Sequence, residues 1–136
     1  IVLALTSNKG AADFEMLGLR NGDENSHLRA EFLYERVLKK VSAWGNPNNL
    51  MFVVGATQAT EFKNIREIVP DHFLLVPGVG FQGGSLQNIS KNAMNSEVGL
   101  LVNVSRTIIF AGDKENFAEE AALIARQYQA EMERYI

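Results

Sequence analysis

Hydrophobic positions along the chain follow two patterns, and their order predicts the fold. Short runs that are apolar on both faces are typical of buried strands in a parallel sheet. Apolar residues spaced three to five apart indicate an amphipathic helix. On this basis we predict strands at 2–5, 50–54, 73–76 and 100–104.

Amphipathic helices are predicted between and after these strands. The first covers about 26–44 and is stopped by 45–47; its apolar positions are Leu28, Phe32, Val37, Val41 and Trp44. A short second helix has Thr60 as its N-cap and ends at Pro70, with apolar positions Phe62, Ile65 and Val69. The last helix runs from about Lys114 to the end of the chain, is capped by Asp113, and carries the stripe Phe117, Ala121, Ile124, Tyr128, Met132 and Tyr135.

The order of elements predicts an α/β fold built from four parallel strand–helix units. A complete (β/α)8 barrel typically needs about 250 residues, so 136 residues leave a small open sheet or half of a barrel. Ligands in such folds bind at the carboxyl ends of the strands. Polar and glycine residues gather after each predicted strand: Thr6, Ser7 and Asn8, then Gly55 and Thr57, then a glycine-rich loop, then Ser105 and Arg106.

Composition narrows the class of protein. The chain is 46% hydrophobic and 21% charged, which suits one globular domain with a core. Its net charge of −3 argues against a basic surface for nucleic acid or an anionic membrane. The absence of cysteine excludes disulfides and thiolate metal sites and fits a reducing cytosol. His27 and His72 lack metal-ligand spacing, so we expect no metal and place both at solvated edges.

The loop after the third strand is the strongest candidate for chemistry. It reads PGVGFQGGSL, with Gly78, Gly80, Gly83 and Gly84 around Gln82. Glycine lets main-chain N–H groups approach an anion. Arg106 follows the next strand, where a guanidinium can hold a phosphate and TIIFAG can begin a short helix. Each feature also has a purely structural alternative: the glycine loop can be a simple turn, and Arg106 can be a partner in a structural ion pair.

Four ordered sequence blocks carry a family resemblance. LALTSNKGAADFE, VVGATQATEFKNIRE, LLVPGVGFQGG and GLLVNVSRTIIFAG resemble the last four strand regions of the orotidine 5′-phosphate decarboxylase family, in its bacterial PGVGxQGG branch. The resemblance implies the C-terminal half (strands 5 to 8) of a (β/α)8 TIM barrel. It makes 1–136 a single partial domain, and we expect the N-terminal half to be absent from this sequence, which begins within an apolar run.

The resemblance also implies an activity and a set of binding residues. Family members are cytoplasmic enzymes, usually homodimers, that convert orotidine 5′-monophosphate to UMP and CO2 without metal or organic cofactor. The resemblance thus implies a nucleotide substrate and a second copy of the chain as partners, and neither a nucleic acid nor a membrane. Gln82 and Arg106 match the residues that bind the phosphate, helped by backbone N–H groups near Gly83, Gly84 and Arg106. Ser7 matches the serine that hydrogen-bonds the pyrimidine, and Thr6 and Asn8 flank it. Pro77 and Gly78 match residues near the pyrimidine ring, and Ser105 precedes the arginine. Phe81 stands where many relatives carry Ala.

The family's catalytic array is missing from this sequence. The D-x-K-x-x-D motif begins at none of the aspartates, which are Asp13, Asp23, Asp71 and Asp113. We therefore expect no catalytic residue in this chain and no decarboxylase activity from it alone. Two alternatives stay open: another sugar-phosphate decarboxylase of the superfamily, such as a keto-gulonate-phosphate decarboxylase, and a non-catalytic half-barrel that binds phosphorylated ligands or associates with itself. TSN and the loop glutamine argue against the first.

Overall fold

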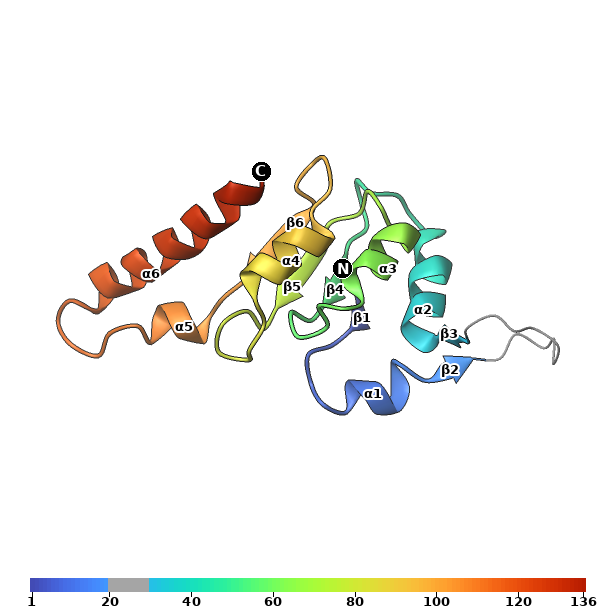
Figure 1. Cartoon of the computed structure of the whole chain (residues 1–136), viewed down its shortest axis with the longest axis horizontal. Coiled ribbons are helices and arrows are strands. Elements are labelled where there is room, and N and C mark those ends of the chain that lie inside the picture. Colours follow the sequence, from blue (N-terminus) through green and yellow to red (C-terminus); the bar gives the residue numbers. More distant parts are fainter. Residues whose placement is uncertain (20–29) are drawn as a thin grey trace.

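A parallel sheet forms the centre of the molecule. The computed structural model describes residues 1–19 and 30–136, and within these ranges four strands are ordered β1-β4-β5-β6 (Figure 1). All neighbouring pairs in this sheet are parallel. The predicted strands are confirmed, with small shifts at their ends: β1 (Val2–Leu5), β4 (Phe52–Val54), β5 (Leu74–Pro77) and β6 (Leu100–Asn103).

Helices connect these strands and follow the last one. A short antiparallel pair, β2 (Gly18–Leu19) and β3 (Glu31–Phe32), precedes the second helix. The α-helices are α1 (Ala11–Phe14), α2 (Leu33–Ser42), α3 (Phe62–Ile68), α4 (Leu86–Ala93), α5 (Arg106–Ile109) and α6 (Phe117–Met132), and a 3₁₀ turn, Glu133–Tyr135, ends the chain. In the described part of the chain, no helix is both long and apolar enough to cross a membrane.

The first long helix is shorter than predicted. It begins at Leu33 because Glu31 and Phe32 are extended and pair with β2. Residues 26–29, including His27 and Leu28, lie outside the described residues. At the other end Trp44 lies beyond the helix in a turn and is 71% exposed, so its assignment to the apolar stripe was wrong.

Two predicted caps are also corrected. The N-cap of α3 is Glu61 rather than Thr60, whose hydroxyl donates to the Glu61 carboxylate instead of to the helix. The last helix begins at Phe117 with Asn116 as N-cap, because 114–117 forms a turn closed by the Phe117 N–H and the Lys114 carbonyl. The sequence pattern had placed no helix at α4, where the Ser85 hydroxyl accepts a hydrogen bond from the Asn88 N–H.

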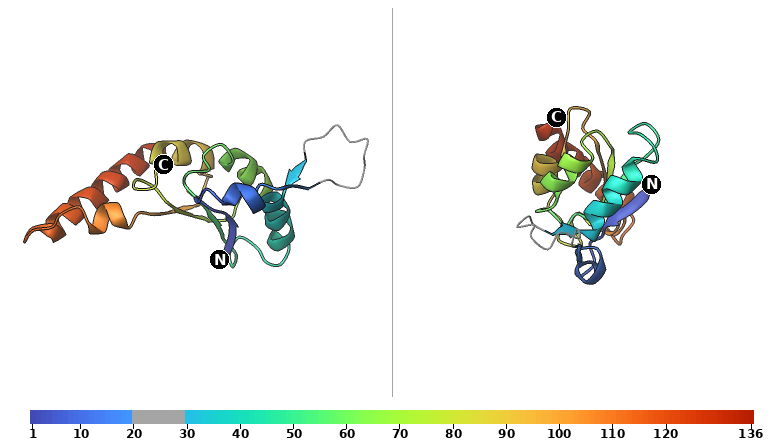
Figure 2. Two further views of the ribbon diagram at one scale, coloured as in Figure 1. Left: turned by 90° about the horizontal axis from the view of Figure 1, so that it is seen from below. Right: turned by 90° about the vertical axis from the view of Figure 1, so that its right-hand side faces the viewer.

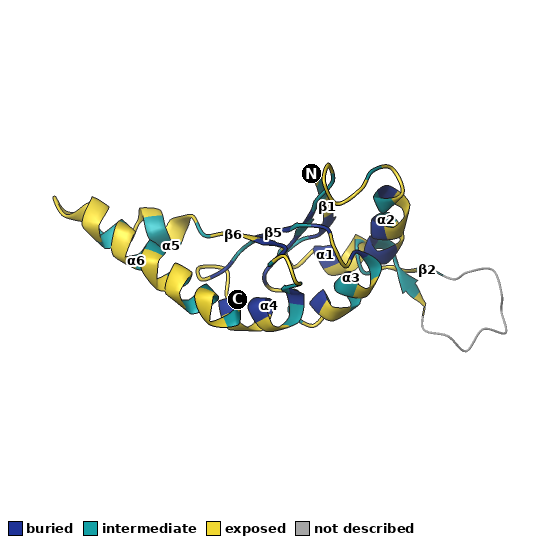
Figure 3. Ribbon diagram, turned by 90° about the horizontal axis from the view of Figure 1, so that it is seen from above, coloured by how far each residue is buried: buried dark blue, intermediate teal, exposed yellow. Residues whose placement is uncertain are grey.

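The helices pack in the same order as the strands. α2 lies against β1 and α3, α3 lies against α4, and α4 lies against α6. Figures 2 and 3 show α3 and α4 together on one side of the sheet. Inward side chains such as Phe52, Leu74 and Ile89 are fully buried between these layers. Burying this surface is the main source of stability for the fold.

The other face of the sheet is apolar but open. Leu3, Val53, Leu75 and Leu101 are paired in register and form one row across the strands. Leu3 is 58% exposed and Leu101 is 45% exposed. A face of this kind is what the inner surface of an incomplete barrel would present.

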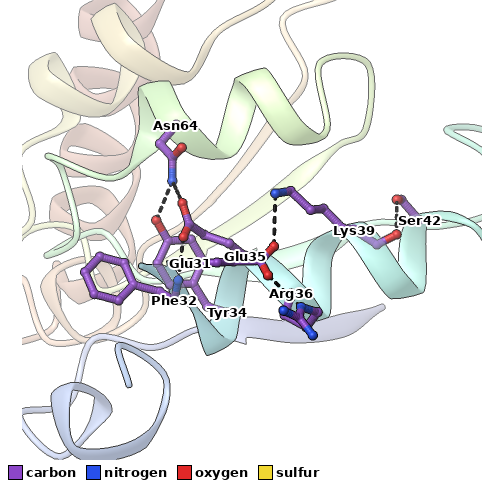
Figure 4. A network of polar contacts seen from close by, with 8 residues as sticks. All are labelled: Glu31, Phe32, Tyr34, Glu35, Arg36, Lys39, Ser42 and Asn64. Carbon is purple, nitrogen blue, oxygen red and sulfur yellow. Dashed lines mark hydrogen bonds and ion pairs between the residues drawn. The ribbon is translucent and has the colours of Figure 1, made fainter. Parts of the chain in front are cut away.

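Polar side chains join α2 to α3. The amide of Asn64 donates to the Tyr34 hydroxyl (2.7 Å) and to the Glu35 carboxylate (2.5 Å) (Figure 4). Glu35 also accepts from the backbone N–H of Phe32 at 2.6 Å, which fixes the start of α2. Tyr34 and Glu35 are both buried, so these bonds satisfy groups that water does not reach.

Arg66 and His72 organise the amino-terminal end of β5. Arg66 donates to backbone carbonyls from several segments, among them those of His72 (2.6 Å) and Gly99 (2.8 Å). His72 was expected at a solvated edge, but it is buried, with its ring centre 5.5 Å from that of Phe52. The expectation was wrong because His72 lies two residues before β5, where its ring packs on the buried Phe52 of β4.

Candidate functional site

A cleft of about 190 Å³ lies at the carboxyl ends of β5 and β6. Pro77 and Asn103 are register partners at these two strand ends, so the loops that follow them begin side by side. The cleft is lined by Pro77, Gly78, Val79, Phe81, Gln82, Asn103, Ser105, Arg106 and Thr107. Half of the residues expected to bind substrate therefore meet in one place: Pro77, Gly78, Gln82, Ser105 and Arg106.

The glycine loop is a closed turn held by its own backbone. Gly78, Gly80 and Gly83 have φ values of +96°, +77° and +88°, which residues with a Cβ rarely adopt. The Gly83 N–H donates to the Gly80 carbonyl and the Gly84 N–H to the Gly78 carbonyl, at 2.8 and 3.2 Å. These two N–H groups are thus used inside the loop. Among the residues that line the cleft, Gln82 and Arg106 offer side-chain N–H donors, and Ser105 and Thr107 offer hydroxyl groups.

Gly78 lies where the loop after β1 approaches the loop after β5. A Cβ at this position would lie 2.5 Å from Gln82 Oε1 and 2.9 Å from Ser7 Oγ. The Ser7 hydroxyl also donates to the Pro77 carbonyl at 3.4 Å. Glycine at position 78 therefore allows the Ser7 and Gln82 side chains to approach the same point from two loops.

Arg106 is the cation of the cleft. It is the first residue of α5 and is exposed, and its guanidinium carbon lies 3.8 Å from the centre of the Phe81 ring. No Asp or Glu is found among the described residues that line the cleft. A cation with this surrounding favours an anion over a metal ion or an organic cation.

Four other predicted site residues are not among those that line the cleft: Thr6, Ser7, Asn8 and Gly83. The Thr6 N–H donates to the Glu15 carboxylate at 2.7 Å, and the Thr6 hydroxyl contacts the same carboxylate and the Asn8 side chain. Gly84 does not line the cleft either: it is buried against Ala56. In this structure Thr6, Asn8 and Gly84 shape the loops around the site.

Sequence reasoning missed several residues of the site. Asn103 accepts a hydrogen bond of 3.0 Å from the Ser105 hydroxyl, and Thr107 lines the cleft next to Arg106. Gln58 supports the first loop by donating to the Thr6 carbonyl at 2.7 Å. Asn103 carried a usable signal, since it is a polar residue inside the apolar run of the fourth strand. Among the described residues no three acidic or imidazole side chains gather as a possible metal site.

The fold and the position of the cleft define the class of protein first. It is an α/β protein with a parallel sheet, and it aligns with about half of the chain in orotidine-monophosphate-decarboxylase barrel structures. The structure of OMP decarboxylase from Leishmania donovani aligns over 94% of this chain and 46% of that chain, with a TM-score of 0.70 and 27% identity. A Toxoplasma gondii structure described as a putative orotidine-monophosphate-decarboxylase aligns over 98% of this chain and 50% of that one, with a TM-score of 0.73 and 24% identity.

Sequence comparison then gives the particular relatives. The orotidine 5′-phosphate decarboxylase of Phocaeicola vulgatus is 52% identical over 134 residues, which are 98% of this chain and 46% of the relative. That of Porphyromonas gingivalis is 53% identical over 133 residues, which are 98% of this chain and 45% of the relative. The chain thus spans about half the length of the curated relatives it matches. No protein-family model matches it. The resemblance to orotidine 5′-phosphate decarboxylase is confirmed.

Proposed function

We propose that the chain is the C-terminal half of an orotidine 5′-phosphate decarboxylase, with β1, β4, β5 and β6 as strands 5 to 8 of its barrel. The order of the strands, the helices on one side and the open apolar row on the other support this placement. So does the sequence, which contains the PGVGxQGG loop and the Ser-Arg strand end but no D-x-K-x-x-D motif. Residues 1–136 are then one partial domain of a cytoplasmic homodimer.

The observation that carries the proposal is the placing of Arg106 and Gln82 on one cleft that contains no carboxylate among its described lining residues. Arg106 presents N–H donors in a planar fork, which suits the paired oxygens of a phosphate. Gln82 adds a neutral amide donor. We assign the 5′-phosphate of the nucleotide to these two side chains, with Ser105 beside them.

The pyrimidine is assigned to the Ser7 side of Gly78. Ser7 Oγ lies near both Gly78 and the Pro77 carbonyl, so its hydroxyl can bond a ring carbonyl or N–H without leaving its present position. Pro77 and Gly78 line the cleft and also lie next to this hydroxyl, so they connect the two assignments. Thr6 and Asn8 flank Ser7 and orient its loop.

Decarboxylation of orotidine 5′-monophosphate breaks the bond from C6 to the carboxylate, releases CO2 and leaves a carbanion-like centre that takes up a proton to give UMP. An ammonium group placed at C6 would stabilise that charge and supply the proton. This chain supplies binding instead: the phosphate does not react, but its binding energy can be used to hold the substrate for the transition state. No metal or organic cofactor takes part in the proposed reaction.

The test is to measure binding and turnover on the same sample of the 136-residue chain. UMP should bind more tightly than uridine, because uridine lacks the phosphate that Arg106 and Gln82 hold. The same sample should release no CO2 from orotidine 5′-monophosphate. Equal affinity for UMP and uridine would overturn the phosphate assignment, and measurable turnover would overturn the assignment of the catalytic array to the missing half.

A further inference from the structure

Phe81 is an exposed aromatic residue whose ring is covered by a cation. The side chain lies at the tip of the glycine loop and is 68% exposed, although large apolar side chains usually gain from burial. The Arg106 guanidinium carbon lies 3.8 Å from the ring centre, well inside the range of a cation–π contact. The two residues follow neighbouring strands, β5 and β6, and both line the cleft.

The loop has little freedom to move Phe81 elsewhere. The Gly80 N–H donates to the Gly84 carbonyl at 3.1 Å, which closes the backbone around residue 81. Gly80 itself is packed: a Cβ there would lie 2.5 Å from the Tyr128 hydroxyl oxygen of α6 and 2.9 Å from Thr107 Oγ1. The loop is therefore held from the side of α5 and α6, and this support places the backbone of Phe81 beside Arg106.

We propose that Phe81 is a positioning residue, which holds the Arg106 guanidinium over the cleft before an anion arrives. This inference rests on the proposed function, in which Arg106 binds the 5′-phosphate. Stacking occupies only the flat face of a guanidinium, and its N–H donors lie in the plane. They stay available to phosphate oxygens while the ring restricts the rotamers of a long side chain.

Pre-ordering is the physical benefit. A free arginine loses much side-chain freedom when it binds, and that loss weakens the complex. An arginine already held on a ring loses less. The ring also keeps water from one face of the guanidinium, which strengthens its attraction to an anion.

The first experiment compares UMP binding to the wild-type chain and to Phe81→Leu, which keeps the apolar bulk but removes the ring. Affinity for UMP should fall roughly two- to fivefold, the range for an exposed cation–π contact, whereas affinity for uridine should not change. Phe81→Trp should retain wild-type affinity. Phe110→Leu is the matched control, because Phe110 is 75% exposed but does not line the cleft. Unchanged UMP affinity in Phe81→Leu would overturn the proposal.

A second measurement needs no ligand. Protons of the Arg106 side chain lie over the Phe81 ring and should show upfield ring-current shifts in the NMR spectrum, which Phe81→Leu should abolish and Phe110→Leu should leave. Identical Arg106 shifts in wild type and Phe81→Leu would also overturn the proposal. Arg106→Ala separates the two claims: if it leaves UMP binding intact, the phosphate site itself is wrong, whereas if only Phe81→Leu is silent, the positioning role alone fails.

Discussion

The hydroxyl of Tyr34 in α2 donates a hydrogen bond of 2.6 Å to the carboxylate of Glu61 at the N-cap of α3. Burial, followed by this carboxylate, raises the pKa of Tyr34 well above its usual value. The tyrosine is consequently a neutral donor throughout the physiological pH range. Together with the Asn64 contacts, this bond fixes how α2 packs against α3.

Replacing Tyr34 by Phe should destabilise the fold by about 1–2 kcal/mol, because Glu61 and Asn64 each lose a partner. Urea unfolding followed by circular dichroism measures the change. Tyr135→Phe is the control, since Tyr135 lies in the C-terminal 3₁₀ turn and is not buried. A Tyr34→Phe variant as stable as Tyr135→Phe would mean that the network contributes nothing to stability.

The buried imidazole of His72 predicts a pH dependence of stability. Burial lowers the pKa of His72; Arg66 acts in the same direction and Asp71 opposes it. Below the unfolded-state pKa of about 6.5 the unfolded chain takes up a proton that the folded chain does not, so this contribution to stability is lost as pH falls toward the folded pKa.

His72→Phe should flatten the dependence in that window. It should cost little stability at neutral pH, because neither imidazole nitrogen has a hydrogen-bond partner among the described residues. Unfolding free energies measured from pH 5 to pH 7.5 check this. A variant with the wild-type slope would assign the pH dependence to other groups.

A side chain at position 84 should destabilise the fold. A Cβ there would overlap the Cβ of Ala56 and approach the Gly78 carbonyl oxygen to 2.8 Å. Gly84→Ala should therefore cost roughly 1–3 kcal/mol, as overpacking does, and should displace the loop that carries Gln82. Gly10→Ala is the matched control, because its Cβ would meet nothing closer than 3.5 Å. Thermal unfolding of the two variants, compared with wild type, decides the matter; equal melting temperatures would contradict the packing argument.

The open row of the sheet predicts self-association of the chain when it is alone. Leu3 and Leu101 stand at the two ends of this row, and burying them against a second copy removes apolar surface from water. In sedimentation the wild-type chain should exceed its 15.1 kDa monomer mass, and Leu3→Lys combined with Leu101→Lys should shift it toward monomer. Trp44→Lys, in the exposed turn after α2 and outside this row, should have no such effect. A wild-type chain that stays monomeric at high concentration would contradict the prediction that this exposed apolar row drives association.

Local patterns predicted the sheet well because each strand is apolar on both faces and ends in glycine or polar residues. They failed where distant contacts decide. The start of α2 depends on the pairing of β3 with β2, and the burial of His72 depends on Phe52 from another strand. Neither contact leaves a periodic signal in the sequence.

The candidate site shows the same division. Gln82 and Arg106 could be named from their loops, and the structure brings them to one cleft. The contact between Phe81 and Arg106 could not be predicted, because it depends on the backbone path of four glycines. Thr6 and Asn8 were named with Ser7, but Glu15, nine positions after Thr6, holds the Thr6 side chain in the loop.

The most direct test of the account is the affinity of the chain for UMP and for uridine, before and after Arg106→Ala. An arginine that binds phosphate forms charge-assisted hydrogen bonds, so the variant should lose UMP affinity by roughly ten- to a hundredfold. Gln82→Ala, which removes a neutral donor, should lose less. Uridine has no phosphate, and its affinity should be the same in wild type and Arg106→Ala. Equal losses for UMP and uridine would show that Arg106 supports the fold rather than the phosphate, and would contradict the assignment.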